Sequence, residues 1–252
     1  MPKAVSSLLA LAILCWPQHA LSQATGKTSL DSIYSDAQSI RGQAAYTAYC
    51  ATCHGAALEG VSAPELSGNR FLERWREGTL DGIYNFIRQR MPLGRSANAP
   101  PIPDRDYLDI VTFILNGNGY PAGSTDVTTA QLGNIMFVGK DGPRPVPDGA
   151  LVITVGCLSQ LPNGTWALVS AIEPARTRSE ISSPAEIKTS AQRILGTLTF
   201  RLAELDAVPD FAPDAHKGHK MQAKGYLVRQ PNAERISLSS MEMLSVECHS
   251  NK

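Results

Sequence analysis

The hydrophobic pattern of this sequence changes once along the chain, between about residues 122 and 136. Before this point apolar residues recur at helical spacing between loops that contain Gly and Pro, whereas after it they fall in short β-rich runs. The 252 residues, 43% of them hydrophobic, are enough to bury two cores of ordinary size. The sequence therefore predicts an α+β protein with two domains, an all-α domain followed by a small all-β domain.

The expected elements follow from these patterns. Helices are expected in the segments 35–50, 71–75, 79–91 and 103–119 of the first half. In the second half, strands are expected at 151–158, 165–170, 196–202, 220–228 and 235–248, with a short helix in 184–195. The Asn163-Gly164 pair is typical of a hairpin turn between the first two strands. Five short strands of this kind indicate a small barrel or sandwich, and the run 218–227 looks like a strand of an OB-like barrel.

The first 22 residues have the pattern of a targeting signal. Lys3 precedes the apolar run 8–14, and the small-residue pattern Ala20-Leu21-Ser22 follows, as in a cleavable secretory signal. An uncleaved N-terminal anchor is the alternative. We expect an exported, periplasmic protein without an integral membrane segment after cleavage. The expected organisation is a signal peptide at 1–22, the helical domain at 24–122, a linker and lead-in segment at 123–149, and the β-rich OB-like domain at 150–252.

Charge excludes one class of partner. The 23 basic and 23 acidic residues cancel, and no aromatic platform interleaves with basic residues. We therefore expect no nucleic-acid partner.

The most specific motif is Cys50-Ala51-Thr52-Cys53-His54. Two thiols at this spacing can each add to one vinyl group of a haem, while the imidazole of the next residue reaches the iron. A thioredoxin-like redox pair, half of a zinc site and chance are the alternatives. A redox pair requires a βαβ setting, and a zinc site requires two further ligands at matching spacing, which this half of the chain lacks. The motif favours one covalently attached haem c with His54 as an iron ligand.

Met91 is the candidate for the opposite face of the iron. Between residues 24 and 122 it is the only methionine, and His54 is the only histidine. A thioether ligand favours ferrous iron and suits an electron carrier. Pro92 lacks an N–H and pushes Met91 toward an extended backbone, so we expect its sulfur to project from a loop. The alternative is that Met91 only fills space in the core.

Several motifs together resemble a known family. They are CATCHG after an Ala- and Tyr-rich helix, the segments 64–68 and 71–75, Met91-Pro92, and a closing helix over 107–119. The sequence resembles the class I c-type cytochromes with a single haem, particularly those that accompany quinoprotein dehydrogenases. The resemblance implies an electron-transfer protein rather than an enzyme, with redox proteins as partners, a quinoprotein dehydrogenase among the candidates. It also implies that the first and last helices cross, with Gly42 opposite Tyr107 and Val111.

Other residues are candidates for shaping the haem pocket. An apolar wall is expected from Leu58, Leu66, Trp75, Ile83, Phe86 and Ile87, each of which could equally be an ordinary core residue. Arg88, Arg90 and Arg95 lie near Met91 and could pair with the haem propionates, although arginines on a solvated face are the commoner case.

Cys157 and Cys248 lie in the first and last expected strands of the second half. If these strands are neighbours the two cysteines can form a disulfide, which export permits. Two buried free thiols are the alternative.

Three functions remain open from sequence. The first is an electron carrier reduced by a periplasmic dehydrogenase and oxidised by a downstream acceptor. The second is a haem peroxidase or gas sensor with a displaceable sixth ligand. In the third, the β domain is a ligand-binding module, and the attached cytochrome domain carries electrons for it. A filled sixth position favours the first.

Overall fold

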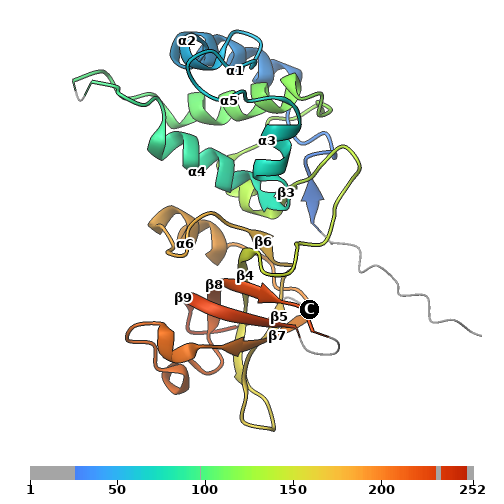
Figure 1. Ribbon diagram of the computed structural model, residues 1–252, viewed down its shortest axis with the longest axis vertical. Helices are drawn as coiled ribbons and strands as arrows, with labels where there is room; N and C mark the ends of the chain where they lie inside the picture. The colour runs from blue at the N-terminus through green and yellow to red at the C-terminus, as the bar shows by residue number, and fades with distance from the viewer. Residues whose placement is uncertain (1–25, 97, 231–233, 249–252) are drawn as a thin grey trace, which may run out of the picture.

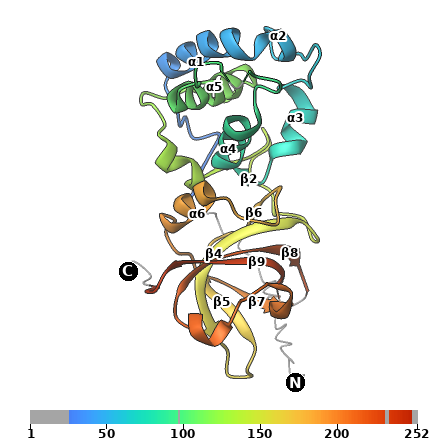
Figure 2. The same ribbon diagram turned by 90° about the vertical axis from the view of Figure 1, so that its left-hand side faces the viewer.

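The computed structural model describes residues 26–96, 98–230 and 234–248. The helices of the first half lie together at one end of the molecule and the large sheet lies at the other, with α6 and β6 between them (Figure 1, Figure 2). We call residues 26–138 the helical part and residues 146–248 the sheet part. The predicted signal peptide lies outside the described residues. Within those residues no helix is both long and apolar enough to cross a membrane.

The helical part contains the four expected helices and a short fifth one. Its helices are α1 (Asp36–Tyr49), α2 (Ala51–His54), α3 (Gly68–Trp75), α4 (Leu80–Arg90) and α5 (Asp104–Gly117). Ser35 caps α1 by accepting a hydrogen bond from the backbone N–H of Gln38. Thr79 and Met91 flank α4 in extended conformations, and for Met91 this confirms the prediction from Pro92. The helical periodicity of the first half is thereby confirmed.

The helices α1 and α5 pack against each other at Gly42. A Cβ atom added there would lie 1.9 Å from the carbonyl oxygen of Asp109 and 3.0 Å from the Cβ atom of Phe113. The close approach of the first and last helices is confirmed, but the residues opposite Gly42 were predicted wrongly. The residues of α5 opposite Gly42 lie two positions further along the helix, so that Asp109 and Phe113 stand there in place of Tyr107 and Val111.

The segment that follows α5 belongs largely to the helical core. It forms the 3₁₀ helix η1 (Thr129–Asn134) and the strand β3 (Ile135–Phe137), which pairs with β1 (Lys27–Thr28) and β2 (Gly78–Thr79). Val127 and Leu132 are buried among the side chains of the helices. The stretch interpreted from sequence as a linker and lead-in therefore contributes to the first core up to Phe137, because its apolar residues complete the wall beside Tyr120.

The sheet part contains all five expected strands. They are β4 (Leu151–Gln160), β5 (Trp166–Ala171), β7 (Leu198–Ala203), β8 (Lys220–Val228) and β9 (Arg235–Ser245), with the two-residue β6 (Ala175–Arg176), the helix α6 (Pro184–Ala191) and the 3₁₀ helices η2 (Leu205–Ala207) and η3 (Pro213–His216). Four of the pairings among the five strands are antiparallel, and β7 and β9 are parallel. The ring of pairings runs β4–β5–β7–β9–β8 and returns to β4, which pairs with both β5 and β8. Its interior holds a second hydrophobic cluster that includes Leu168, Phe200 and Leu227.

A disulfide joins Cys157 in β4 to Cys248 just after β9. The two residues are 91 positions apart, and their Cα atoms are 5.6 Å apart. The predicted bridge is therefore confirmed. The bridge links the segment after β9 to β4, the first strand of the sheet part.

Main-chain and side-chain bonds join the two parts at Glu77. The backbone N–H of Arg176 in β6 donates to the Glu77 carbonyl oxygen at 2.6 Å, and the Arg176 guanidinium lies 3.4 Å from the Glu77 carboxylate. Nearby, the buried Arg193 lies 4.0 Å from the Asp81 carboxylate in the first turn of α4. These contacts fix α3 and α4 relative to the sheet.

Candidate functional site

The Cys-x-x-Cys-His motif begins where α1 ends. Cys50 closes α1, because its N–H donates to the Tyr46 carbonyl at 2.8 Å, and its own carbonyl accepts from His54 at 3.0 Å in the short helix α2. The thiols of Cys50 and Cys53 are free. Burial, and secondarily the neighbouring Cys53, raise the pKa of the Cys50 thiol to about 11. Both sulfurs are therefore unpaired and lie within one turn of each other and of His54.

The His54 ring is oriented by a backbone carbonyl. Its Nδ1 lies 2.7 Å from the carbonyl oxygen of Pro64. Because a carbonyl oxygen only accepts hydrogen bonds, Nδ1 carries the proton and donates it. The Nε2 atom is left with a free lone pair, which is the arrangement that a metal-binding histidine requires.

The loop after the motif is tied down on both sides. The carbonyl of Cys53 accepts from the backbone N–H groups of Val61 and Ala63, both at 3.0 Å. At its far end, the Asn118 side chain donates to the Leu66 carbonyl at 2.9 Å and accepts from the Gly68 N–H at 3.1 Å. Pro64, which orients His54, is thereby held between the motif and the end of α5.

Met91 lies at the C-terminal end of α4. Its backbone is extended, its N–H donates to the Ile87 carbonyl at 2.9 Å, and the Met91-Pro92 peptide bond is cis. The Met91 carbonyl accepts a hydrogen bond from the Tyr107 hydroxyl at 3.0 Å. Burial is the largest cause that raises the pKa of Tyr107. Tyr107 on α5 is therefore a protonated donor that holds the Met91 loop.

The expected apolar wall is present around these residues. Leu58, Trp75 and Ile83 are buried in the helical core, and Leu66, Phe86 and Ile87 pack against it half-buried. Trp75 and Phe86 meet edge to face with ring centroids 5.3 Å apart. These six side chains could form a dry wall, which for a haem iron raises the reduction potential.

One predicted arginine has another partner. Arg88 pairs with Asp104 through two hydrogen bonds of 2.6 and 3.1 Å. This ion pair joins α4 to the start of α5. Arg90 and Arg95 form no ion pair among the described residues. Arg90 lines a cavity together with Met91.

Sequence reasoning did not predict the hydrogen bonds by which three residues organise the site, and it had assigned Tyr107 only a place at the crossing of the first and last helices. The Pro64 carbonyl holds His54, the Tyr107 hydroxyl holds Met91, and the Asn118 amide holds the intervening loop. Pro64 and Tyr107 stood inside the family-like motifs, but nothing in their spacing shows which atom they bond.

These residues fit a covalently attached haem. Two free thiols, an imidazole with Nε2 available and an apolar wall are the donor set that haem c requires. The Met91 thioether stands at the end of α4, and the other methionine of the helical part, Met136, lies in β3.

Comparison with known proteins gives one match. The family described as cytochrome C oxidase, cbb3-type, subunit III matches residues 37–114, which run from α1 to α5. No curated protein and no solved structure matches the chain. The matched segment contains Cys50, Cys53, His54 and Met91. Residues 37–114 are thus similar to a c-type cytochrome domain, a class that implies haem c and a role in electron transfer.

Proposed function

We propose that this protein is a single-haem electron carrier. Cys50 and Cys53 would hold the haem covalently, and His54 and Met91 would be the protein ligands of its iron. The observation that carries the proposal is the hydrogen bond from His54 to Pro64, which leaves Nε2 free beside two unpaired thiols within the family-matched segment. Haem supplies the redox chemistry, a one-electron cycle between ferric and ferrous iron.

The chain's own residues attach and orient the group. Cys50 and Cys53 would hold the haem through two thioether bonds, one to each vinyl group. The Pro64 carbonyl keeps Nδ1 of His54 protonated and fixes the plane of the ring. The Tyr107 hydroxyl anchors the backbone of Met91 and so keeps the thioether near the iron.

The rival function is a haem enzyme or gas sensor whose sixth ligand is displaced by substrate. The anchoring of Met91 on both sides, through Ile87 and Tyr107, supports a permanent ligand and hence electron transfer without catalysis. Carbon monoxide discriminates between the two. Slow or absent binding to the reduced protein at neutral pH supports the carrier, and rapid binding supports the rival.

The sheet part is proposed to be an OB-like barrel that serves as an interaction module. Support comes from the closed ring of pairings, in which the third and fifth strands, β7 and β9, are parallel. Domain limits of 24–122 for the cytochrome and 150–252 for the barrel follow from the sequence, with the apolar residues of 127–137 packed on the cytochrome. Its role is to place the haem beside a redox protein, for which a quinoprotein dehydrogenase is the proposed donor.

The proposed location is outside the cytoplasm. The signal-like N-terminus and the Cys157–Cys248 disulfide both support export, because disulfides persist in oxidising compartments. The periplasm is the compartment in which such a carrier meets a dehydrogenase.

The test is maturation of the full chain in a host that attaches haem c. Intact mass should show one haem per chain, retained after acid extraction, and the oxidised spectrum should contain the weak sulfur-to-iron band. Met91→Ala should abolish this band while haem stays attached, and a Cys50→Ala, Cys53→Ala double variant should lose covalent haem. A colourless product without haem mass would refute the proposal. A band that persists in Met91→Ala would refute the ligand assignment.

A further inference from the structure

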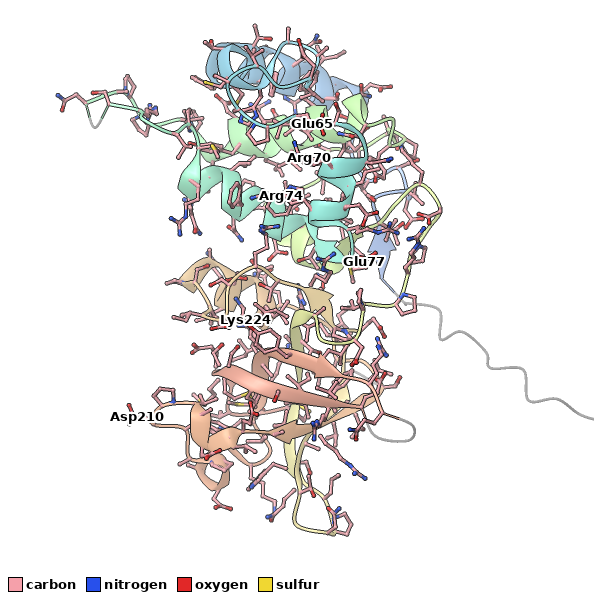
Figure 3. All side chains as sticks on the ribbon, in the orientation of Figure 1. Glu65, Arg70, Arg74, Glu77, Asp210 and Lys224 are labelled. Carbon is pink, nitrogen blue, oxygen red and sulfur yellow. A yellow bond between two sulfur atoms is a disulfide. The ribbon has the colours of Figure 1, made fainter. Side chains whose placement is uncertain are left out.

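A cavity of about 820 Å³ lies where the helical part meets the sheet part. We call it the arginine cavity. The helical part lines it with residues of α3, β2, α4 and the turn after α4, including Arg74, Trp75, Arg90 and Met91. The sheet part lines it with residues of β4, β6 and α6 and of the segments after β6 and α6, including Arg178 and Arg193. Figure 3 shows Arg74 on the side of the helical part that faces the sheet.

The lining is strongly basic. It contains Arg74, Arg76, Arg90, Arg176, Arg178 and Arg193, against only Asp81 and Glu186. Three of the six have acidic partners, since Arg76 and Arg176 pair with Glu77 and Arg193 faces Asp81. Arg74, Arg90 and Arg178 form no ion pair within the ranges that the structure describes.

Arg74 and Arg178 come from different parts of the chain and converge on one ring. The Arg178 guanidinium lies 5.2 Å from the centroid of Trp75, and that of Arg74 lies 5.5 Å from the same centroid. Arg178 also donates to the Arg74 carbonyl oxygen at 3.3 Å. The pKa of Arg178 is lowered, first by burial and then by the charges of Arg74 and Arg176. The two guanidinium groups repel each other beside the indole ring, and a bound anion would offset this repulsion.

The least exposed arginine of the cavity lining is also incompletely hydrogen-bonded. Arg193 is 4% exposed, and its Nε atom has no hydrogen-bond partner. Its nearest acid, Asp81, is 4.0 Å away, beyond hydrogen-bond distance. The lining of the cavity thus combines arginines that have no ion pair with a buried donor that has no hydrogen-bond partner.

Met91 lines the same cavity. This inference rests on the proposed function, in which Met91 binds the haem iron. A haem bound there brings two carboxylates, its propionates, into the neighbourhood of Met91. We propose that Arg178 of the sheet part, together with Arg74 of α3, binds a propionate carboxylate of the haem, so that the sheet part completes the haem site.

The proposal gives the sheet part an electrostatic role. A guanidinium near the haem destabilises the more positive ferric state relative to the ferrous state, and so it raises the reduction potential. Since Arg178 belongs to the sheet part, the potential of the haem depends on how the two parts are joined. Docking a partner on the sheet then acts on the haem through Arg178.

The experiment uses the full-length holoprotein with ¹³C at the haem carboxylates. Arg178→Gln and Arg74→Gln are compared with Arg201→Gln, which removes the same charge from the exposed face of β7, away from the cavity. The reduction potential is measured together with the redox-difference infrared bands of the labelled carboxylates. Arg178→Lys tests whether charge alone suffices, because lysine lacks the planar fork that grips a carboxylate.

We expect Arg178→Gln to lower the ferrous-to-ferric ratio at a fixed ambient potential about threefold, which is about 28 mV at 59 mV per tenfold for one electron. The labelled bands should shift in Arg178→Gln and Arg74→Gln, shift less in Arg178→Lys, and stay unchanged in Arg201→Gln.

Unchanged labelled bands in Arg178→Gln would overturn the inference, even with a changed potential, because the arginine would then act only at a distance. Inorganic phosphate that binds the parental holoprotein and not Arg178→Gln, with the bands unchanged, would assign the arginines to a free anion and also overturn it. In both cases covalent haem with the sulfur-to-iron band leaves the proposed function standing, whereas a chain matured without haem overturns both.

Discussion

The Tyr107 hydroxyl donates a hydrogen bond to the carbonyl oxygen of Met91 at 3.0 Å, and this bond connects the closing helix of the helical part to the loop that carries the thioether. The tyrosine is buried, and burial raises its pKa, so it stays protonated and able to donate throughout the ordinary pH range. The bond therefore holds the backbone of Met91 independently of the sulfur.

Tyr107→Phe removes this bond and nothing else of comparable size. We expect the free energy of unfolding to fall by about 0.5 to 1.5 kcal/mol, the usual net worth of one hydrogen bond. We also expect carbon monoxide to bind the reduced holoprotein faster, because Met91 is released more often. Stopped-flow mixing measures the rate. Tyr84→Phe is the matched control, since the buried Tyr84 hydroxyl makes no hydrogen bond among the described residues. Equal binding rates in both variants would contradict the anchoring role.

Gly42→Ala tests the crossing of α1 and α5. Its Cβ atom would lie 1.9 Å from the Asp109 carbonyl oxygen, a backbone atom that moves only if the helices separate. We expect a loss of about 1 to 3 kcal/mol in the free energy of unfolding, measured by urea titration. Gly82→Ala in α4 is the control, because its Cβ atom meets nothing within 4 Å, and a helical Gly-to-Ala change there should gain about 0.5 to 1 kcal/mol. A neutral Gly42→Ala variant would show that the crossing is looser than described.

The Cys157–Cys248 bridge closes a long loop of the sheet part. Replacing both cysteines by alanine should cost about 3 to 5 kcal/mol in the chain-entropy account. The measurement is the unfolding transition of the sheet part, with and without reductant. The parental protein should lose stability on reduction and the double variant should not, while thioether-bound haem is unaffected by the reductant. Alkylation of both cysteines in unreduced protein would contradict the bridge.

Asp126 makes stability depend on acid pH. Its carboxylate accepts from the Ser35 hydroxyl and pairs with Arg41 at 2.6 Å, and these contacts, the hydroxyl first, hold its pKa below 3.8. A depressed carboxyl pKa stabilises the fold above the unfolded value, and the contribution disappears as the pH falls through the folded pKa. Asp126→Asn should therefore be less stable than the parental chain at pH 6, and the difference should shrink below about pH 3.8. Chemical unfolding between pH 6 and 3 measures it. A difference that grows toward low pH would reverse the assigned sign.

The helices and long strands of this protein were predictable because their signals are local. Ser35 precedes α1, Met91-Pro92 follows α4, and Asn163-Gly164 joins β4 to β5, all within a few residues of the boundaries that they set. The two-residue strands β1, β2 and β6 were missed, because so short a run has no periodicity and pairs only through tertiary contact. The residue opposite Gly42 was missed for a related reason, since it depends on the rotation of α5 about its axis.

The same division holds at the candidate site. Cys50, Cys53 and His54 lie within five consecutive residues, so the sequence motif alone identifies them. The contacts of His54 with Pro64 and of Met91 with Tyr107 are set by the folded loop, and no spacing rule predicts which carbonyl a side chain meets. Arg178 lies more than eighty residues from Met91, and only the joined structure places both on one cavity.

The bond between Arg176 and Glu77 makes the molecule mechanically continuous. Glu77 donates its own N–H to Phe137 at 2.9 Å and immediately precedes β2, which leads without a break into α4. A pull on β6 is therefore passed through the main chain to the start of the helix whose other end is Met91. A partner protein that binds the sheet part and displaces β6 would therefore also move α4, whose C-terminal end carries the Met91 thioether.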